Sequence, residues 1–309
     1  MILNQIIKDK PILDLHVHIG PELLRRRYNI ISLAKEAQHK HFGFAAKNHF
    51  QPTTALATLI SEKYEIPIIG SITLNKGVGG INFEAVRAAI SGFKSNTQKS
   101  NRKKGRFIVW MPTIHAEAHL IYNNRKDIIS KWGSLTKYQC TYPEGTGITI
   151  LDKRNPNSLN EKTLEVLKLI AKEDLVLATG HLSSQEVELL VKEALNIGIK
   201  RIIVTHPFFQ ATNMSIEKQV DLSKLEGVFL ELCYVNLKMD NIPINCYIKL
   251  IKIAGPKNII LSSDLGQISN ETVGDGWENY FQLLNKEGIS QEEFIQMAVD
   301  NPHKIVIEN

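Results

Sequence analysis

Short apolar runs, bounded by glycine, proline or polar residues, alternate along the chain with longer amphipathic segments. Runs of this length are typical of parallel strands that are buried on both faces. Eight of them predict strands at 11–17, 42–46, 66–72, 106–111, 175–179, 201–205, 228–232 and 258–262. Helical periodicity predicts helices between most of them, including 31–40, 52–65, 84–93, 159–172, 184–197 and 245–254. This alternation predicts an α/β fold, a (β/α)8 TIM barrel, with a doubly wound open sheet as the alternative.

The connection between the fourth and fifth predicted strands is much longer than the others. A barrel needs only its last part, the amphipathic helix at 159–172. We therefore predict a single domain over 1–309, with residues 112–158 as an insertion after the fourth strand. Such an insertion lies on the face formed by the carboxyl ends of the strands, where long ordered loops tend to form lids or to bind substrate.

Composition indicates an ordinary globular protein, with 43% hydrophobic and 22% charged residues. The net charge of +5, from 37 basic and 32 acidic residues, is too small and too dispersed to indicate a nucleic-acid partner. One basic cluster spans 94–106. We interpret it as a solvated loop, and an anion-binding patch is the alternative.

The cysteines indicate a reducing compartment. Cys140, Cys233 and Cys246 form no Cys-x-x-Cys pair and no disulfide framework, so we expect a cytoplasmic protein. The first residues lack the apolar core and cleavage site of a signal peptide, and no stretch approaches the length of a membrane span. We expect a small-molecule substrate, no membrane partner, and possible association into a homo-oligomer.

Isolated histidines and one aspartate stand where the predicted strands stop. His16 and His18 end the first strand, His181 and His206 follow the fifth and sixth, and Asp264 follows the eighth. Carboxyl ends of barrel strands converge on one mouth, and strand residues two apart point to the same side. The five side chains therefore predict a metal site. Mixed imidazole and carboxylate ligation suits zinc first, with manganese or iron as alternatives.

Asp264 has more than one candidate role in such a site. It can ligate the ion, accept a proton from metal-bound water, or do both. We predict that it acts as the proton shuttle. The number of divalent ions, one or two, stays open at this point.

These strand-end residues resemble the pattern of the amidohydrolase superfamily of metal-dependent hydrolases. In that superfamily His-x-His ends the first strand, single histidines end the fifth and sixth, and an aspartate ends the eighth. The resemblance spans Asp14 to Asp264, and Asn301-Pro302 resembles an Asn-Pro found near the end of many members. More narrowly, the segments 14–22, 47–50 and 109–113 resemble a little-characterised amidohydrolase-like bacterial family, which supplies no substrate.

One position departs from the superfamily pattern. Many binuclear members carry a carboxylated lysine or a glutamate at the end of the fourth strand, which here ends without either. Lys47, at the end of the second strand, is a candidate metal ligand if it is carboxylated, or a cation for an anionic substrate group; the alternative is a solvated lysine. His115 is a candidate if its loop turns inward, although His115 and His119 can equally form a solvated helical face.

Further candidates for substrate binding come from the loops at the same face. Gly79 and Gly80 follow the third strand and permit close backbone approach to a carboxylate or phosphate, with a tight turn as the alternative. His49 lies beside Lys47 at the predicted mouth. Glu231, in the seventh strand, either lines the pocket or is a buried structural carboxylate.

These observations predict a metal-dependent hydrolase of an amide, a cyclic amide or a lactone. A metal-dependent decarboxylase and a phosphoesterase are alternatives, because the same barrel ligands serve several reactions. A barrel that only binds a metal or a small molecule is the non-enzymatic alternative. The presence of Asp264 beside the histidines argues against it, since loss of function usually removes the proton-handling carboxylate.

Overall fold

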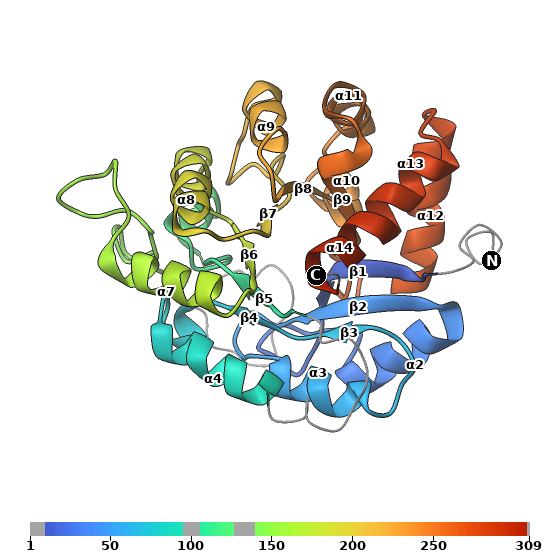
Figure 1. The fold of residues 1–309 in the computed structure, drawn as a ribbon, viewed down its shortest axis with the longest axis horizontal. Helices are drawn as coiled ribbons and strands as arrows, with labels where there is room; N and C mark the ends of the chain where they lie inside the picture. The colour runs from blue at the N-terminus through green and yellow to red at the C-terminus, as the bar shows by residue number, and fades with distance from the viewer. Residues whose placement is uncertain (1–9, 95–105, 127–139, 308–309) are drawn as a thin grey trace.

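A computed structural model describes residues 10–94, 106–126 and 140–307 (Figure 1). The predicted basic cluster lies almost entirely outside these ranges. Parallel strands form a three-stranded sheet, β1-β2-β3, and a six-stranded sheet, β4-β5-β6-β7-β8-β9. The strands are β1 (Ile12–His18), β2 (Phe42–Lys47), β3 (Ile68–Ile69), β4 (Ser71–Thr73), β5 (Ile108–Trp110), β6 (Val176–Ala178), β7 (Ile202–Val204), β8 (Val228–Cys233) and β9 (Ile259–Ser262).

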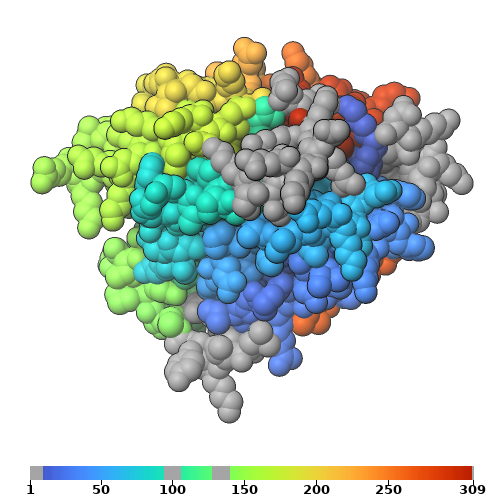
Figure 2. All heavy atoms as spheres, turned by 60° about the horizontal axis from the view of Figure 1, so that its bottom comes forward, coloured from blue at the N-terminus to red at the C-terminus, as the bar shows by residue number. Residues whose placement is uncertain are grey.

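Helices surround the strands (Figure 1), as alternation of strand and helix predicts. In the space-filling view, the blue to cyan part of the chain lies together on one face of the molecule (Figure 2). Within the described ranges no helix is long and apolar enough to cross a membrane. The α-helices are α2 (Ile30–Lys40), α3 (Thr54–Ser61), α4 (Phe83–Lys94), α5 (Glu117–Tyr122), α7 (Glu161–Lys172), α8 (Ser184–Ile197), α9 (Ile216–Ser223), α10 (Tyr234–Met239), α11 (Ile244–Ala254), α12 (Val273–Lys286), α13 (Gln291–Ile295) and α14 (Asn301–Val306). Short 3-10 turns, η1 (Lys76–Val78) and η2 (Pro256–Asn258), and one π-helical turn, η3 (Gln296–Asp300), complete the chain.

The third predicted strand is not continuous. It is divided at Gly70 into β3, which pairs with β2, and β4, which pairs with β5. The start of α3 lies against this point, because a Cβ on Gly70 would meet Thr54 Cα at 2.5 Å. Thr53 supplies hydrogen bonds to the backbone where the strand is interrupted. Its N–H donates to Ser71 O and its hydroxyl accepts from Ser71 N, both at 2.8 Å. The single strand predicted at 66–72 is therefore corrected to two short ones.

The first strand and the segment after the last strand are joined at their carboxyl ends. Asp264 N–H donates to His16 O at 2.8 Å, and His18 N–H donates to Leu265 O at 2.7 Å. Gly266 permits this contact, because its φ is +127° and a Cβ there would meet His18 O at 2.1 Å. These bonds place Asp264 directly beside the two histidines of β1.

Two apolar clusters lie on opposite sides of the strands. The inner one contains Leu13, Leu15 and Trp110, and α14 contributes Ile305 and Val306 to it. The outer one packs the strands against the surrounding helices. The pairing of β1 with β2 shifts register between Asp14 and Val17. This irregularity lets Leu15 join the inner cluster while Val17 joins the outer one, so the strict alternation of side chains is broken just before the histidines.

The described parts of the predicted insertion pack against α8. Its two halves meet where His115 O accepts from Ile148 N at 2.8 Å. Glu186, which forms the capping box of α8 with Ser183, also accepts from the hydroxyl of Thr149 at 2.7 Å. One carboxylate thus fixes both the start of α8 and the returning half of the insertion. Residues 127–139 of the insertion lie outside the described ranges.

Candidate metal centre

The strand-end side chains meet around one cavity of ≈ 90 Å³, which His18, His181, His206 and Asp264 line together with apolar side chains such as Phe209. His206 and Asp264 have positive φ values of 21° and 54°. A non-glycine residue in this region carries a backbone cost of about 1–3 kcal/mol, and such residues cluster at functional sites. The strain directs two of the predicted ligands toward one place.

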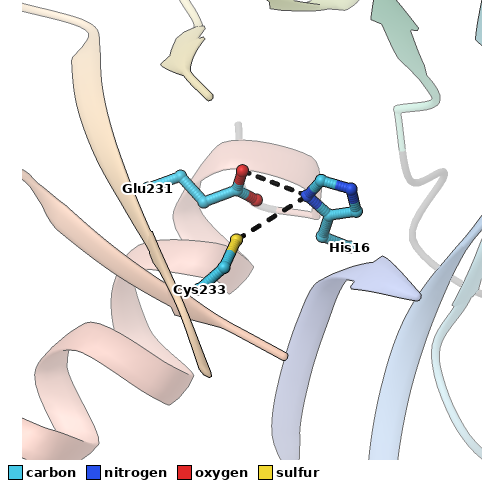
Figure 3. A group of neighbouring side chains, drawn as sticks. All are labelled: His16, Glu231 and Cys233. Atoms are coloured by element: carbon cyan, nitrogen blue, oxygen red, sulfur yellow. Dashed lines mark hydrogen bonds and ion pairs between the residues drawn. The ribbon is translucent and has the colours of Figure 1, made fainter. Parts of the chain in front are cut away.

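His16 is buried, does not line the cavity, and is held by a buried carboxylate (Figure 3). Its Nδ1 lies 3.1 Å from Glu231 Oε2 and 3.8 Å from Cys233 Sγ. An ionised carboxylate only accepts, so Nδ1 carries the proton and donates to Glu231. The lone pair of His16 is then on Nε2. Glu231 therefore fixes the orientation and tautomer of His16, as the carboxylate partner of a metal-binding histidine does, and it does not line the cavity.

A cation already lies at the free nitrogen of His16. Lys47 Nζ is 2.7 Å from His16 Nε2 and 4.1 Å from the centre of the Trp110 ring. Lys47 is 1% exposed, and burial lowers its pKa to about 8 although Asp264 and Glu231 oppose the shift. Lys47 is thus buried below the histidines and does not line the cavity as a substrate-binding side chain would.

Asp264 connects the two histidines of β1. Its Oδ1 lies 2.9 Å from His18 Nε2 and 3.2 Å from His16 Nε2. One ligand atom each from His16, His206 and Asp264 lies within 4.8 Å of the others, a separation that one ion can span. His206 Nδ1 is buried and has no hydrogen-bond partner among the described residues. Such a polar atom without a partner fits a site that binds a divalent cation.

On the side of β6 and β7 the histidines contact one another and the ring of Phe209, and the Asp240 carboxylate also lines the cavity. His181 Nδ1 lies 2.8 Å from His119 Nδ1, and the His181 ring centre is 4.9 Å from that of His206. His206 lies 5.8 Å from His16, ring centre to ring centre. The structure therefore brings all four predicted histidines together and adds His119 from α5.

Burial disfavours the charged form of four histidines that line the cavity. It lowers the pKa values of His18, His49 and His181 well below the ordinary histidine value, and it lowers that of His206 to about 4. A neutral imidazole has the lone pair that a metal requires. These four imidazoles are therefore in the neutral form, which can bind a metal, at neutral pH.

A second set of potential metal ligands lies near the cavity, but its carboxylate already has other partners. Glu22, His18 and His49 also bring ligand atoms within 4.8 Å of one another. Glu22, however, forms an ion pair with Arg26 through Oε1 and accepts the backbone N–H of His49 at 2.8 Å through Oε2. His49 Nδ1 lies 3.1 Å from the Thr113 hydroxyl. This group is better explained as an internal network than as an ion site.

The remaining candidates from the sequence lie elsewhere. Gly79 and Gly80 line surface grooves beside α7 and the insertion and do not line the histidine cavity. His115 Nε2 lies 3.0 Å from the Tyr142 hydroxyl and is also absent from the cavity wall. Arg26, in contrast, lines the cavity and was not a candidate. The only available signal was its place in three consecutive arginines shortly after the first strand.

Solved structures show which fold this arrangement belongs to. A putative 2-pyrone-4,6-dicarboxylic acid hydrolase from Pseudomonas putida has a TM-score of 0.57 at 11% identity, over 96% of this chain and 97% of its own. An organophosphorus hydrolase from Deinococcus radiodurans has a TM-score of 0.56 at 14% identity, over 95% and 91%. A Burkholderia multivorans amidohydrolase with bound zinc has a TM-score of 0.56 at 10% identity, over 96% and 98%. The chain therefore has the amidohydrolase fold, as the strand-end pattern predicts.

Sequence comparison places the chain within a family. Residues 11–231, more than half of the chain, match a family of unknown function, DUF6282. The protein belongs to this family. No curated protein matches the sequence.

Proposed function

We propose that the protein is a metal-dependent hydrolase that acts on an amide, a cyclic amide or a lactone of a small molecule. The observation that carries the proposal is the meeting of His16, His206 and Asp264 within 4.8 Å beside His18 and His181. The names of the structural neighbours support the reaction class, since they are hydrolases and one contains zinc. They do not identify the bond that this protein would break.

One divalent ion, zinc in the first place, would be held by His16, His18 and Asp264, with His206 and His181 completing one site or contributing to a second. Such an ion supplies Lewis-acid activation of water and of the substrate oxygen. Asp264 accepts the proton of the attacking water and returns it to the leaving group. Glu231 holds His16 in the tautomer that has its lone pair on Nε2.

In this proposal, the charge or the position of Lys47 must change when the ion binds. Its amine lies 2.7 Å from the nitrogen that would ligate the ion. Two cations cannot share that nitrogen, so Lys47 must lose its charge or turn away. A pKa of about 8 makes the neutral amine accessible near neutral pH. Reaction of this neutral amine with carbon dioxide, which forms an N–C bond and releases the amine proton to solvent, would give a carbamate and turn Lys47 from a competitor into a ligand.

The proposal also treats the two sheets as one closed (β/α)8 barrel, with β3 and β4 as its third strand and residues 112–158 as the insertion after its fourth strand, β5. The hydrogen bonds between β1 and residues 264–265 support closure. Closure places the ends of β1, β6, β7 and β9 around a single opening.

Metal content is the direct test. The full chain is purified without chelator, beside the His16→Ala/His18→Ala variant, and both are measured by elemental analysis and then screened with lactones and amides. We expect one or two equivalents of zinc, manganese or iron and turnover in the wild type, and loss of both in the variant. Failure to bind metal even after reconstitution would overturn the proposal.

A further inference from the structure

The strongest unexplained feature of the cavity is a buried arginine in its wall. Arg26 lines the cavity, and its side chain is only 5% exposed. It lies between β1 and α2, where Arg26 pairs with Gln267 and the N–H of Arg27 donates to Gly266 O at 2.8 Å. The backbone of this loop is therefore fixed against the segment that contains Asp264.

The guanidinium of Arg26 is held at one edge and open at the other. Nε forms the ion pair with Glu22, and Nη2 lies 3.2 Å from His18 Nδ1. Nη1 has no partner among the described residues of the protein. An arginine has five N–H donors in a planar fork, so at least the two on Nη1 are available to a ligand in the cavity.

The other cavity walls suggest which ligand this is. Arg26 is the one lysine or arginine among the described residues that line the cavity, and the carboxylates of Asp240 and Asp264 line it as well. Leu24, Ile114, Val235 and other apolar side chains form much of the remaining wall. A molecule that fits both features has an anionic group and an apolar body.

Metal loading would release more of the guanidinium. If His18 Nδ1 accepts from Arg26, the proton of His18 is on Nε2, where it donates to Asp264 at 2.9 Å. An ion held through Nε2 requires the other tautomer, with the proton on Nδ1. Two donors then face each other, so the Arg26–His18 hydrogen bond is lost and Nη2 becomes available beside Nη1.

We propose that Arg26 is the substrate-specificity residue of this site and binds a carboxylate of the substrate through its two terminal nitrogens. Paired N–H donors match the two oxygens of a carboxylate, and Glu22 keeps the fork in one orientation. The substrate class is therefore an apolar amide or lactone that also bears a carboxylate. This assignment rests on the proposed hydrolase function for the identity of the bond that is broken, but the binding of a carboxylate can be tested without turnover.

The test is calorimetric binding of phenylacetate, with phenylacetamide as its uncharged match, to the zinc-loaded full chain. We compare the wild type with Arg26→Gln, and use Arg25→Gln as the matched control because Arg25 is an exposed neighbour. Arg26→Gln should weaken phenylacetate binding by at least about tenfold, since a hydrogen bond to a charged group is lost. Arg25→Gln should leave it unchanged, and phenylacetamide should bind weakly to all three proteins.

Two results would overturn the assignment. One is equal phenylacetate affinity in the wild type and in Arg26→Gln, which would mean that the carboxylate binds elsewhere, for instance to the zinc. The other is tighter, Arg26-dependent binding of phenylphosphonate, which would replace the carboxylate by a phosphorus oxyanion. Arg26→Lys keeps the positive charge but not the planar guanidinium, so its affinity for phenylacetate should be intermediate. This variant replaces Arg26→Gln in the test if Arg26→Gln does not fold. Arg26-dependent binding without hydrolysis of any substrate would refute the proposed function alone.

Discussion

The two sides of the cavity differ in how their histidines are held. On the side of β1, each histidine contacts a carboxylate: Glu231 and Asp264 for His16, and Asp264 for His18. On the side of β6 and β7, His181 contacts another imidazole, and His206 Nδ1 has no partner among the described residues. Both sides are buried, so the difference lies in charge and not in access to solvent.

This difference indicates the order in which ions bind. A carboxylate lowers the cost of bringing a divalent cation into a buried site, and Glu231 also fixes the His16 tautomer that has its lone pair on Nε2. Among the described residues, His16 and His18 each have a carboxylate within ion-pair distance, whereas His181 and His206 have none, so we expect the first ion on the β1 side. The β6–β7 side can complete its coordination or hold a weaker second ion.

The largest effect should come from Asp264, the carboxylate that the two histidines of β1 share. Asp264→Asn removes the proton acceptor while leaving His16, His18 and Glu231 in place, so in protein saturated with zinc we expect kcat to fall by about 10²–10⁴-fold although the site is still filled. Steady-state kinetics and elemental analysis on the same samples check this. Asp221→Asn, which changes an exposed aspartate, is the control. Unchanged turnover in Asp264→Asn would show that Asp264 is not the proton shuttle.

The next largest effect should come from Glu231. Its substitution tests the orientation of His16 separately from metal binding, because Glu231 contacts His16 but does not line the cavity. Glu231→Gln keeps the shape of the side chain but removes the charge that faces His16 Nδ1, so zinc affinity should fall by about 10- to 100-fold. Competition with a chelating dye measures it, and Glu226→Gln is a control at an exposed position just before β8. Equal zinc affinities in the two variants would remove the distinction between the two sides of the cavity.

The pH dependence of the metal-free protein tests the neutral imidazoles on both sides. Burial lowers the pKa of His206 from 6.5 to about 4, so its contribution to stability is present above pH 6.5 and is lost as the pH falls toward 4. Between pH 7 and pH 5 this single group should cost about 1–2 kcal/mol of unfolding free energy. His18, His49 and His181 shift in the same direction.

The carboxyl group of Asp14 opposes this loss of stability at low pH. Burial raises the pKa of Asp14 to about 6, so its contribution is lost as the pH rises and partly offsets one histidine. The net expectation is still a loss of stability on acidification, measured by urea unfolding of zinc-free protein at pH 7 and pH 5. His206→Asn should reduce the slope. A metal-free protein that is more stable at pH 5 than at pH 7 would contradict the neutral histidine cluster.

The sequence was sufficient to predict the residues at the strand ends, because this information is local. A buried strand shows itself as an apolar run, and the residue that follows the run must lie at the rim. His16, His18, His181, His206 and Asp264 are placed in this way without knowledge of any long-range contact. The division of the third strand could not be predicted, because it depends on the contact between Gly70 and the start of α3.

Side chains on loops were harder to place, because their positions also depend on contacts between residues that are distant in the sequence. The segment that contains Arg26 has no periodicity, and its path is set by bonds to residues near Gly266, distant in sequence. His115 and His119 are four residues apart and fit one helical face equally well. The helix α5 begins only at Glu117, however, so His115 lies before it and contacts Tyr142, while His119 reaches the cavity.

The smallest effect should come from His119, which supports the weaker side of the cavity. His119→Ala removes the contact with His181 Nδ1, at 2.8 Å, but leaves both carboxylates of the β1 side intact. The loss of one hydrogen bond corresponds to a decrease in kcat/KM of about 2- to 10-fold. The first equivalent of zinc should bind as in the wild type, and His39→Ala, at an exposed position in α2, is the control. If His119→Ala instead removes the first equivalent of zinc, the β6–β7 side, and not the side with the carboxylates, holds the primary ion.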